Sequence, residues 1–183
     1  MHDATRNSIF VTNVAIMKKY SQEPSIQGLA KEPESFYGLN NKYERIISVL
    51  GGSVNVNQNI TSDFDLIEIT RKGLPKSVVT TLSAILGISM EQMSNLIHVS
   101  HRTIQRKSDT DLLNVYSTEQ IFEIAVVISR GIEVLGTLEA FTSWLHSDVR
   151  HLDYQKPINF LDTSFGTNMI KDTLGRIEHG VFS

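Results

Sequence analysis

Apolar residues recur every three or four positions along most of the chain, which is the spacing of amphipathic helices. No segment alternates apolar and polar residues for long, so the pattern predicts no β-strand. The sequence therefore predicts an all-α fold. The expected helices cover about residues 43–50, 62–73, 75–87, 89–97, 101–107, 117–135, 138–146 and 166–179, with a short helical turn beginning at Pro157.

Residues that favour helix ends mark many of these boundaries. Ser62 is expected to cap a helix with an acidic first turn, and Pro75 to lie in the first turn of the next one. Two capping-box pairs are expected. They are Ser89 with Gln92 and Ser117 with Gln120. In the last helix, the side chains expected to face inward are Met169, Ile170, Thr173, Leu174 and Ile177.

The stretch from Ser89 to Lys107 has the pattern of a helix-turn-helix. This motif requires a small residue in its first helix and buried apolar residues on both sides of the turn. Ser94 is the small residue. The positions expected to be buried are Met93, Ile97, Val99 and Ile104. His98 stands where a left-handed glycine is usual, and this departure implies some backbone strain.

Polar and basic side chains are expected to point outward from the second helix of this motif. They are His101, Arg102, Thr103, Gln105, Arg106 and Lys107. The arginines and the lysine suit phosphate contacts, and the other three suit base edges. The sequence therefore predicts DNA binding here. Two alternatives stay open: a helical hairpin with a solvated basic face, and a helix-turn-helix that no longer binds DNA.

The helical pattern predicts three regions. Residues 1–41 form an irregular arm, in which only Ile9 to Tyr20 could be helical, since Pro24, Gly28, Pro33 and Gly38 interrupt the remainder. Residues 42–109 form a helical DNA-binding region with the helix-turn-helix at 89–107, and residues 110–183 form a second helical region. The helix from Glu119 to Leu135 is apolar over more than one stripe, as a homodimer interface or a buried central helix would be.

Composition narrows the classes of function. The net charge of −3 over 183 residues excludes a uniformly basic polyanion binder, so DNA contact must be local. The absence of cysteine excludes disulfides and thiolate zinc sites, and no run approaches the roughly 20 apolar residues of a membrane span. We therefore expect a cytoplasmic protein. No catalytic residue, metal or cofactor is expected, because His98 and His101 lack further ligands and no phosphate loop is present.

Four stretches of the second half occur together in one known family. They are "SHRTIQRK", the "GxxEAFxxWL" spacing from Gly136 to Leu145, "PINFLDT", and "GTNMIKDTLGRIEHGVF" at the end of the chain. With them, the chain from about Tyr43 to Phe182 resembles antitoxins of the Xre/MbcA/ParS type. In that family a helix-turn-helix region precedes a small helical toxin-binding domain.

The resemblance implies a bacterial type II toxin–antitoxin module. The partner would be a RES-domain toxin, which is similar in fold to ADP-ribosyltransferases and depletes cellular NAD. The C-terminal domain would block the active-site cleft of the toxin, while the DNA-binding half represses the operon. A palindromic operator would require a homodimer.

The end of the chain carries the expected toxin contacts. Gly180, Val181, Phe182 and Ser183 follow the last helix as a tail with two apolar residues, which suits a pocket on a partner. Lys171 and Arg176 could steer this end toward an acidic or phosphate-recognising cleft. In the alternatives, Phe182 folds back onto Trp144 or Phe165 to complete the core of its own domain, and the two basic residues are simply solvated.

Two other functions stay open at this point. A stand-alone helix-turn-helix regulator would use its C-terminal half for dimerisation or for binding a ligand. An all-α enzyme would show a concave pocket containing titratable groups with perturbed pKa values.

Overall fold

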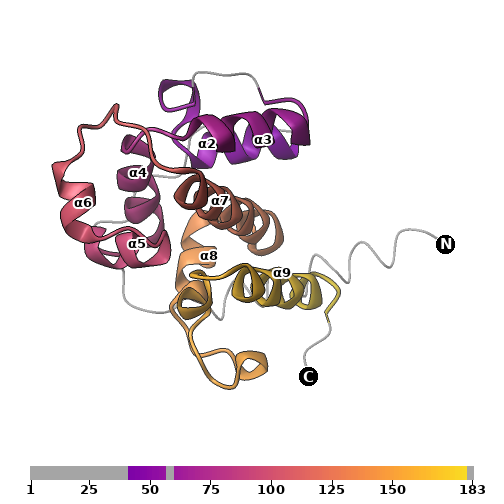
Figure 1. The fold of residues 1–183 in the computed structure, drawn as a ribbon. Coiled ribbons are helices and arrows are strands. Elements are labelled where there is room, and N and C mark those ends of the chain that lie inside the picture. Colours follow the sequence, from indigo (N-terminus) through magenta and orange to yellow (C-terminus); the bar gives the residue numbers. More distant parts are fainter. Residues whose placement is uncertain (1–40, 57–59, 181–183) are drawn as a thin grey trace.

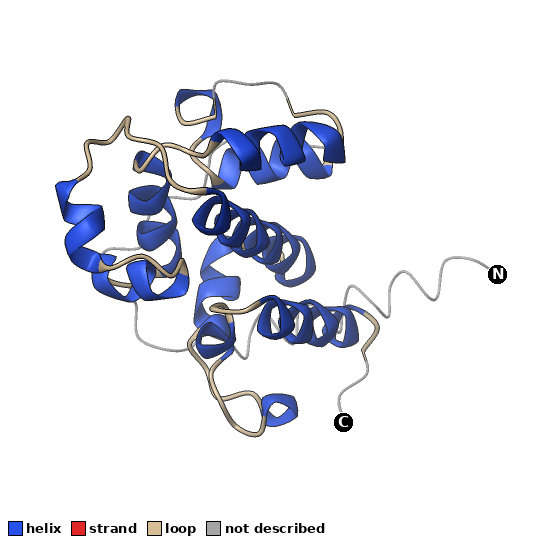
Figure 2. Cartoon of the chain, viewed as in Figure 1, coloured by secondary structure: helices blue, strands red, loops and turns tan. Residues whose placement is uncertain are grey.

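The computed structural model describes residues 41–56 and 60–180, and all of the elements below belong to these two ranges. The possible helix from Ile9 to Tyr20 and the tail residues Val181 to Ser183 lie outside them. The described chain is helical without a strand, so the predicted all-α class is confirmed (Figure 2). Two isolated β-bridges join Pro75 to Leu112 and Val149 to Gln155.

The helices follow the predicted order closely. They are α2 (Lys42–Val49), α3 (Asp63–Lys72), α4 (Ser77–Leu86), α5 (Met90–Leu96), α6 (His101–Arg106), α7 (Val115–Leu135), α8 (Leu138–Leu145) and α9 (Ser164–Glu178). Three short 3₁₀ helices lie between them: η2 (Gly52–Val54), η3 (Arg150–Leu152) and η4 (Pro157–Phe160).

Helix α7 runs through the middle of the molecule and contacts α2, α3, α8 and α9 (Figure 1). Its side chains Ile121, Ile124 and Ile128 are completely buried. Burial on several sides explains why apolar residues cover more than one stripe of this helix. Within one chain, α7 is therefore a central core helix.

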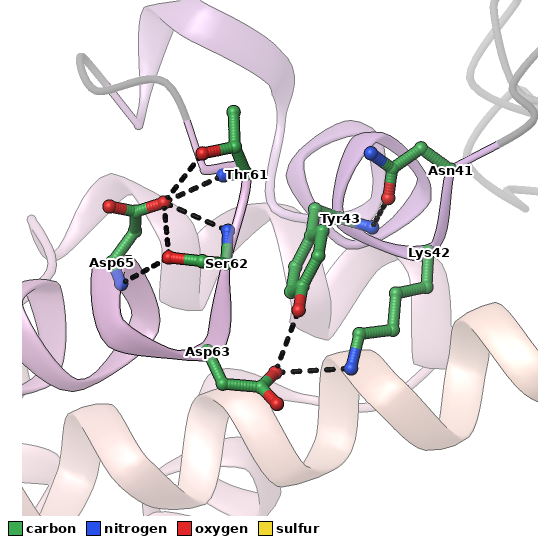
Figure 3. A network of polar contacts seen from close by, with 7 residues as sticks. All are labelled: Asn41, Lys42, Tyr43, Thr61, Ser62, Asp63 and Asp65. Carbon is green, nitrogen blue, oxygen red and sulfur yellow. Dashed lines mark hydrogen bonds and ion pairs between the residues drawn. The ribbon is translucent and has the colours of Figure 1, made fainter.

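A polar network joins the start of α2 to the start of α3 (Figure 3). Asn41 caps α2 by accepting a hydrogen bond of 3.0 Å from the backbone N–H of Tyr43. The Lys42 ammonium and the Tyr43 hydroxyl both donate to Asp63 Oδ1, each at 3.0 Å. The hydrogen bond from Lys42, followed by that from Tyr43, lowers the pKa of Asp63. The network fixes the angle between two helices that are separated by a loop.

Ser62 caps α3, as predicted, and together with Asp65 it forms a complete capping box, which was not predicted. The Ser62 hydroxyl accepts from the Asp65 N–H, and Asp65 Oδ2 accepts from the Ser62 N–H at 2.8 Å. The same oxygen accepts from the Thr61 N–H at 2.8 Å, and this bond is the largest cause of the lowered pKa of Asp65. These bonds satisfy donors that the first helical turn otherwise leaves without partners.

The capping box predicted for Ser117 with Gln120 is wrong. Helix α7 begins earlier, directly after Asn114, whose side chain accepts from the Ser117 N–H at 2.9 Å. The Ser117 hydroxyl donates instead to the Ile97 carbonyl at 3.0 Å, and Gln120 Nε2 donates to the Leu161 carbonyl at 2.6 Å. Both side chains make tertiary contacts, which a local sequence pattern does not reveal.

Three smaller predictions also fail. Pro75 precedes α4, because Lys76 is the N-cap residue and the helix begins at Ser77. Val99 is half-buried and not fully enclosed. Met169 is 46% exposed, because the buried stripe of α9 passes through Ile170, Thr173, Leu174 and Ile177.

Candidate functional site

Helices α5 and α6 form the predicted helix-turn-helix. The Ser89–Gln92 capping box starts α5, with hydrogen bonds of 2.9 and 3.1 Å. Ser94 is fully buried, and its hydroxyl donates to the Met90 carbonyl at 2.6 Å. The apolar residues that fix the motif to the core are Met93, Ile97 and Ile104, each at most 1% exposed. The spacing predicted from the sequence is therefore confirmed.

His98 adopts the left-handed conformation expected at this turn, with φ of 57°. Its Nε2 atom lies 2.7 Å from the backbone carbonyl of Asp162, just before α9. Since a carbonyl only accepts, Nε2 carries the proton in this contact. The ring thereby joins the turn of the motif to the start of the last helix, which gives a physical reason for a histidine where glycine is usual.

His98 both adopts a strained left-handed conformation and forms a hydrogen bond to Asp162. These two properties predict different results for two substitutions. His98→Gly loses a hydrogen bond worth about 1 kcal/mol but removes a similar strain, so the free energy of unfolding should stay within about 1 kcal/mol of the wild type. His98→Val loses the bond and places a β-branched residue at positive φ, so we expect a loss of about 2 kcal/mol. Urea unfolding measures both. Equal losses for the two variants would show that strain is negligible here.

Helix α6 presents the expected DNA-binding side chains unequally. Arg102, Thr103, Gln105 and Arg106 are exposed, whereas His101 and Lys107 are half-buried. The Lys107 ammonium donates to the Leu112 carbonyl at 2.9 Å, and the Thr103 hydroxyl lies 2.7 Å from the Ser100 hydroxyl. Of the predicted set, Arg102, Gln105 and Arg106 are therefore the most available for an external ligand.

The connector after α6 is fastened to the body of the protein. The Lys76 ammonium forms an ion pair of 2.6 Å with Asp109. Asp111 accepts from the Ser108 backbone N–H at 2.9 Å, and bonds from the Ser108 side chain and then its backbone lower the pKa of Asp111. The acidic residues nearest to α6 are thus held in internal contacts. In Figure 1, α6 lies at the left edge of the molecule.

An ion-pair network holds the C-terminal end of α9 against α7. The Arg130 guanidinium pairs with Glu178 on α9 and, at 3.1 Å, with Glu133 on its own helix. Arg45 on α2 reaches Glu133 at 3.6 Å. Burial lowers the pKa of Arg130, but the hydrogen bond to Glu133 and the charge of Glu178 outweigh it, so the net change is upward. The network fixes the last turn before the tail.

The residues expected to contact a toxin fall in different environments. Lys171 is half-buried, and its ammonium lies 3.1 Å from Glu123 Oε2. Arg176 and Gly180 are exposed, and Gly180 has φ of 69°. Val181, Phe182 and Ser183 lie outside the described residues, so their predicted role is untested. The structure thus makes Lys171 an internal partner of α7, while Arg176 faces outward.

A groove of about 380 Å³ lies along α3 and α7. Its apolar lining comes from Leu66, Ile67, Val115, Phe122 and Val126, and Lys171 and Glu123 are paired in it.

Among the described residues, no group of three histidine, aspartate or glutamate side chains could hold a metal ion. In the same part of the chain, no helix is long and apolar enough to cross a bilayer.

The fold defines a helix-turn-helix protein whose central helix leads into a second helical unit. Residues 65–126 match the family model of the antitoxin Xre-like helix-turn-helix domain. Residues 130–180 match that of the antitoxin Xre/MbcA/ParS C-terminal toxin-binding domain. Consecutive parts of the chain therefore match both domains of the Xre/MbcA/ParS antitoxins, as the sequence resemblance predicted.

Two curated relatives share most of their length with this chain. Antitoxin Xre of Yersinia enterocolitica is 22% identical over 120 residues, which cover 64% of this chain and 81% of the relative. Antitoxin Xre of Photorhabdus laumondii is 23% identical over 117 residues, which cover 63% and 79%.

Proposed function

We propose that this chain is the antitoxin of a type II toxin–antitoxin pair and that its partner is a RES-domain toxin that depletes NAD. The observation that carries the proposal is that the two antitoxin family models match consecutive parts of the chain, 65–126 and 130–180. On this proposal the protein acts by stoichiometric occlusion of the toxin and not by catalysis.

On this proposal, residues 42–109 bind DNA and residues 110–183 bind the toxin. The exposed Arg102, Gln105 and Arg106 support a role for α6 in operator binding. Repression of its own operon would need a homodimer, because one recognition helix reads few bases. The ion pair between Arg130 and Glu178 holds the last turn of α9 against α7, and the tail that follows it in sequence is proposed to enter the cleft of the toxin.

The proposal is tested with the product of the adjacent gene, which the proposal expects to be a RES-domain toxin, by following the loss of NAD in vitro. The full chain should suppress NAD loss when added in stoichiometric amount. A version ending at His179 should leave most of the activity, because it lacks the apolar tail that would fill the cleft. Equal inhibition by both versions would exclude the tail as the blocking element. If neither version binds the RES protein, the antitoxin role fails, and a stand-alone DNA-binding regulator is favoured.

A further inference from the structure

Within the described residues, two large apolar side chains have no partner on the outer face of α9. Phe165 is 87% exposed and Met169 is 46% exposed. Because they are four residues apart in a helix, their side chains lie on the same face, one turn from each other. Exposing both to water is unfavourable, since each would gain free energy by burial against another surface.

The protein's own core does not account for this face. The buried stripe of α9 consists of Ile170, Thr173, Leu174 and Ile177, each at most 8% exposed. Asp172 and Arg176 continue the outer face toward the C-terminal end of the helix, and both are exposed. Helix α9 therefore has a complete inner contact with α7 and a second face that is apolar at its start and charged at its end.

We propose that this outer face, formed by Phe165, Met169 and Arg176, is a docking surface for the toxin, in addition to the tail. The proposal rests on the proposed function. Two observations favour the toxin as the partner of this face. The face belongs to residues 130–180, which match a toxin-binding domain. In sequence, the same helix leads into the tail that is proposed to block the cleft of the toxin. A partner that holds the tail would pass along the same helix.

The spacing defines what the partner must offer. Positions 165, 169 and 176 span about 16 Å of helix at about 1.5 Å per residue. An amphipathic helix lying in a groove uses anchors with this spacing. The toxin would supply an apolar pocket for Phe165 and Met169 and, about 10 Å further along, an acidic group for Arg176.

The face is presented on a helix that is fixed at both ends. At its start, a Cβ on Gly166 would lie 2.0 Å from the carbonyl oxygen of Phe160, so only glycine permits this close approach to η4. At its end, Glu178 pairs with Arg130 on α7. Fixed anchors lose little conformational entropy on binding, which favours affinity.

The experiment compares two equally exposed phenylalanines. Phe165→Ser on α9 and Phe64→Ser on α3, where Phe64 is 79% exposed, remove the same side chain from different surfaces. Binding to the purified RES-domain protein is measured by titration calorimetry with the full chain, after circular dichroism has verified equal thermal midpoints. Phe165→Ser should weaken binding by about 30-fold or more, as expected for an aromatic anchor, and Phe64→Ser should leave it unchanged.

Met169→Ser is the second variant and should weaken binding by several-fold in the same direction. Wild-type affinity for both α9 variants would overturn the docking surface while leaving the antitoxin role intact. Equal weakening by Phe64→Ser would overturn it as well, because the effect would not be specific to α9. If Phe165→Ser changes only the sedimentation of the free chain, the face joins two copies and the proposal is wrong. Absence of binding by the wild type would refute the proposed function itself.

Discussion

Replacing Arg102 and Arg106 together by glutamate lowers the affinity for operator DNA by about 100-fold or more at physiological salt. Both side chains are exposed on α6, so the substitutions reverse two charges on each recognition helix of the proposed dimer. Each arginine that neutralises a phosphate releases counterions, and reversal adds repulsion to that loss. Fluorescence anisotropy with a labelled fragment of the chain's own promoter measures the effect.

The matched control for this prediction reverses two charges elsewhere. Arg71 and Lys72 are exposed at the end of α3, and replacing both by glutamate changes the net charge by the same amount. This control should retain most of the affinity. If both double variants bind equally weakly, only net charge matters. If the α6 variant binds normally, α6 is not the recognition helix, and the helix-turn-helix serves as a spacer.

Replacing Gly131 by alanine destabilises the protein by about 2–3 kcal/mol, although alanine is the better helix former by about 1 kcal/mol. A Cβ at this position in α7 would lie 2.0 Å from Cδ2 of Phe141, whose ring on α8 is fully buried. The ring has no free space to move into, so α7 and α8 must separate and lose packing. Chemical unfolding measures the loss.

Gly175 provides the same substitution without the clash. It lies inside α9, and a Cβ there would meet no atom of the described residues within 4 Å. Gly175→Ala should therefore stabilise the protein by about 0.5–1 kcal/mol. The two variants should shift stability in opposite directions. A stable Gly131→Ala variant would show that the contact between α7 and α8 is looser than the structure indicates.

Local signals in the sequence predicted the helices and much of the helix-turn-helix. The Ser62 and Ser89 caps and the buried Ile104 depend on neighbours a few residues away, so a pattern can reveal them. Gly136 ends α7 with φ of 90°, and a glycine directly after an apolar helix is a local signal of the same kind.

The remaining features depend on residues that are distant in sequence. The contact of His98 with Asp162 spans 64 residues, and that of Gln120 with Leu161 spans 41, so no local pattern shows them. The spacing of Met169 fits the apolar stripe of α9 and therefore predicts a core position. Met169 lies at the border of that stripe, and the position of α7 determines which residues at the border are covered. The pair of Phe165 and Met169, four residues apart, was the available signal for a second apolar face.

The two proposed binding surfaces belong to different helices, α6 and α9 (Figure 1). Helix α6 packs against α5, whereas α9 packs against α7 and η4. On the proposed assignment, DNA on α6 leaves α9 accessible. A substitution on α6 that abolishes operator binding should therefore leave toxin neutralisation intact.

Growth of a bacterial host that expresses the product of the adjacent gene, the proposed RES-domain toxin, tests the antitoxin role most directly. The wild-type chain and the Arg102→Glu, Arg106→Glu variant should both restore growth when co-expressed, because on the proposed assignment neutralisation requires α9 and the tail and not DNA. Failure of the wild-type chain to restore growth, with both proteins present in the cell, would contradict the account.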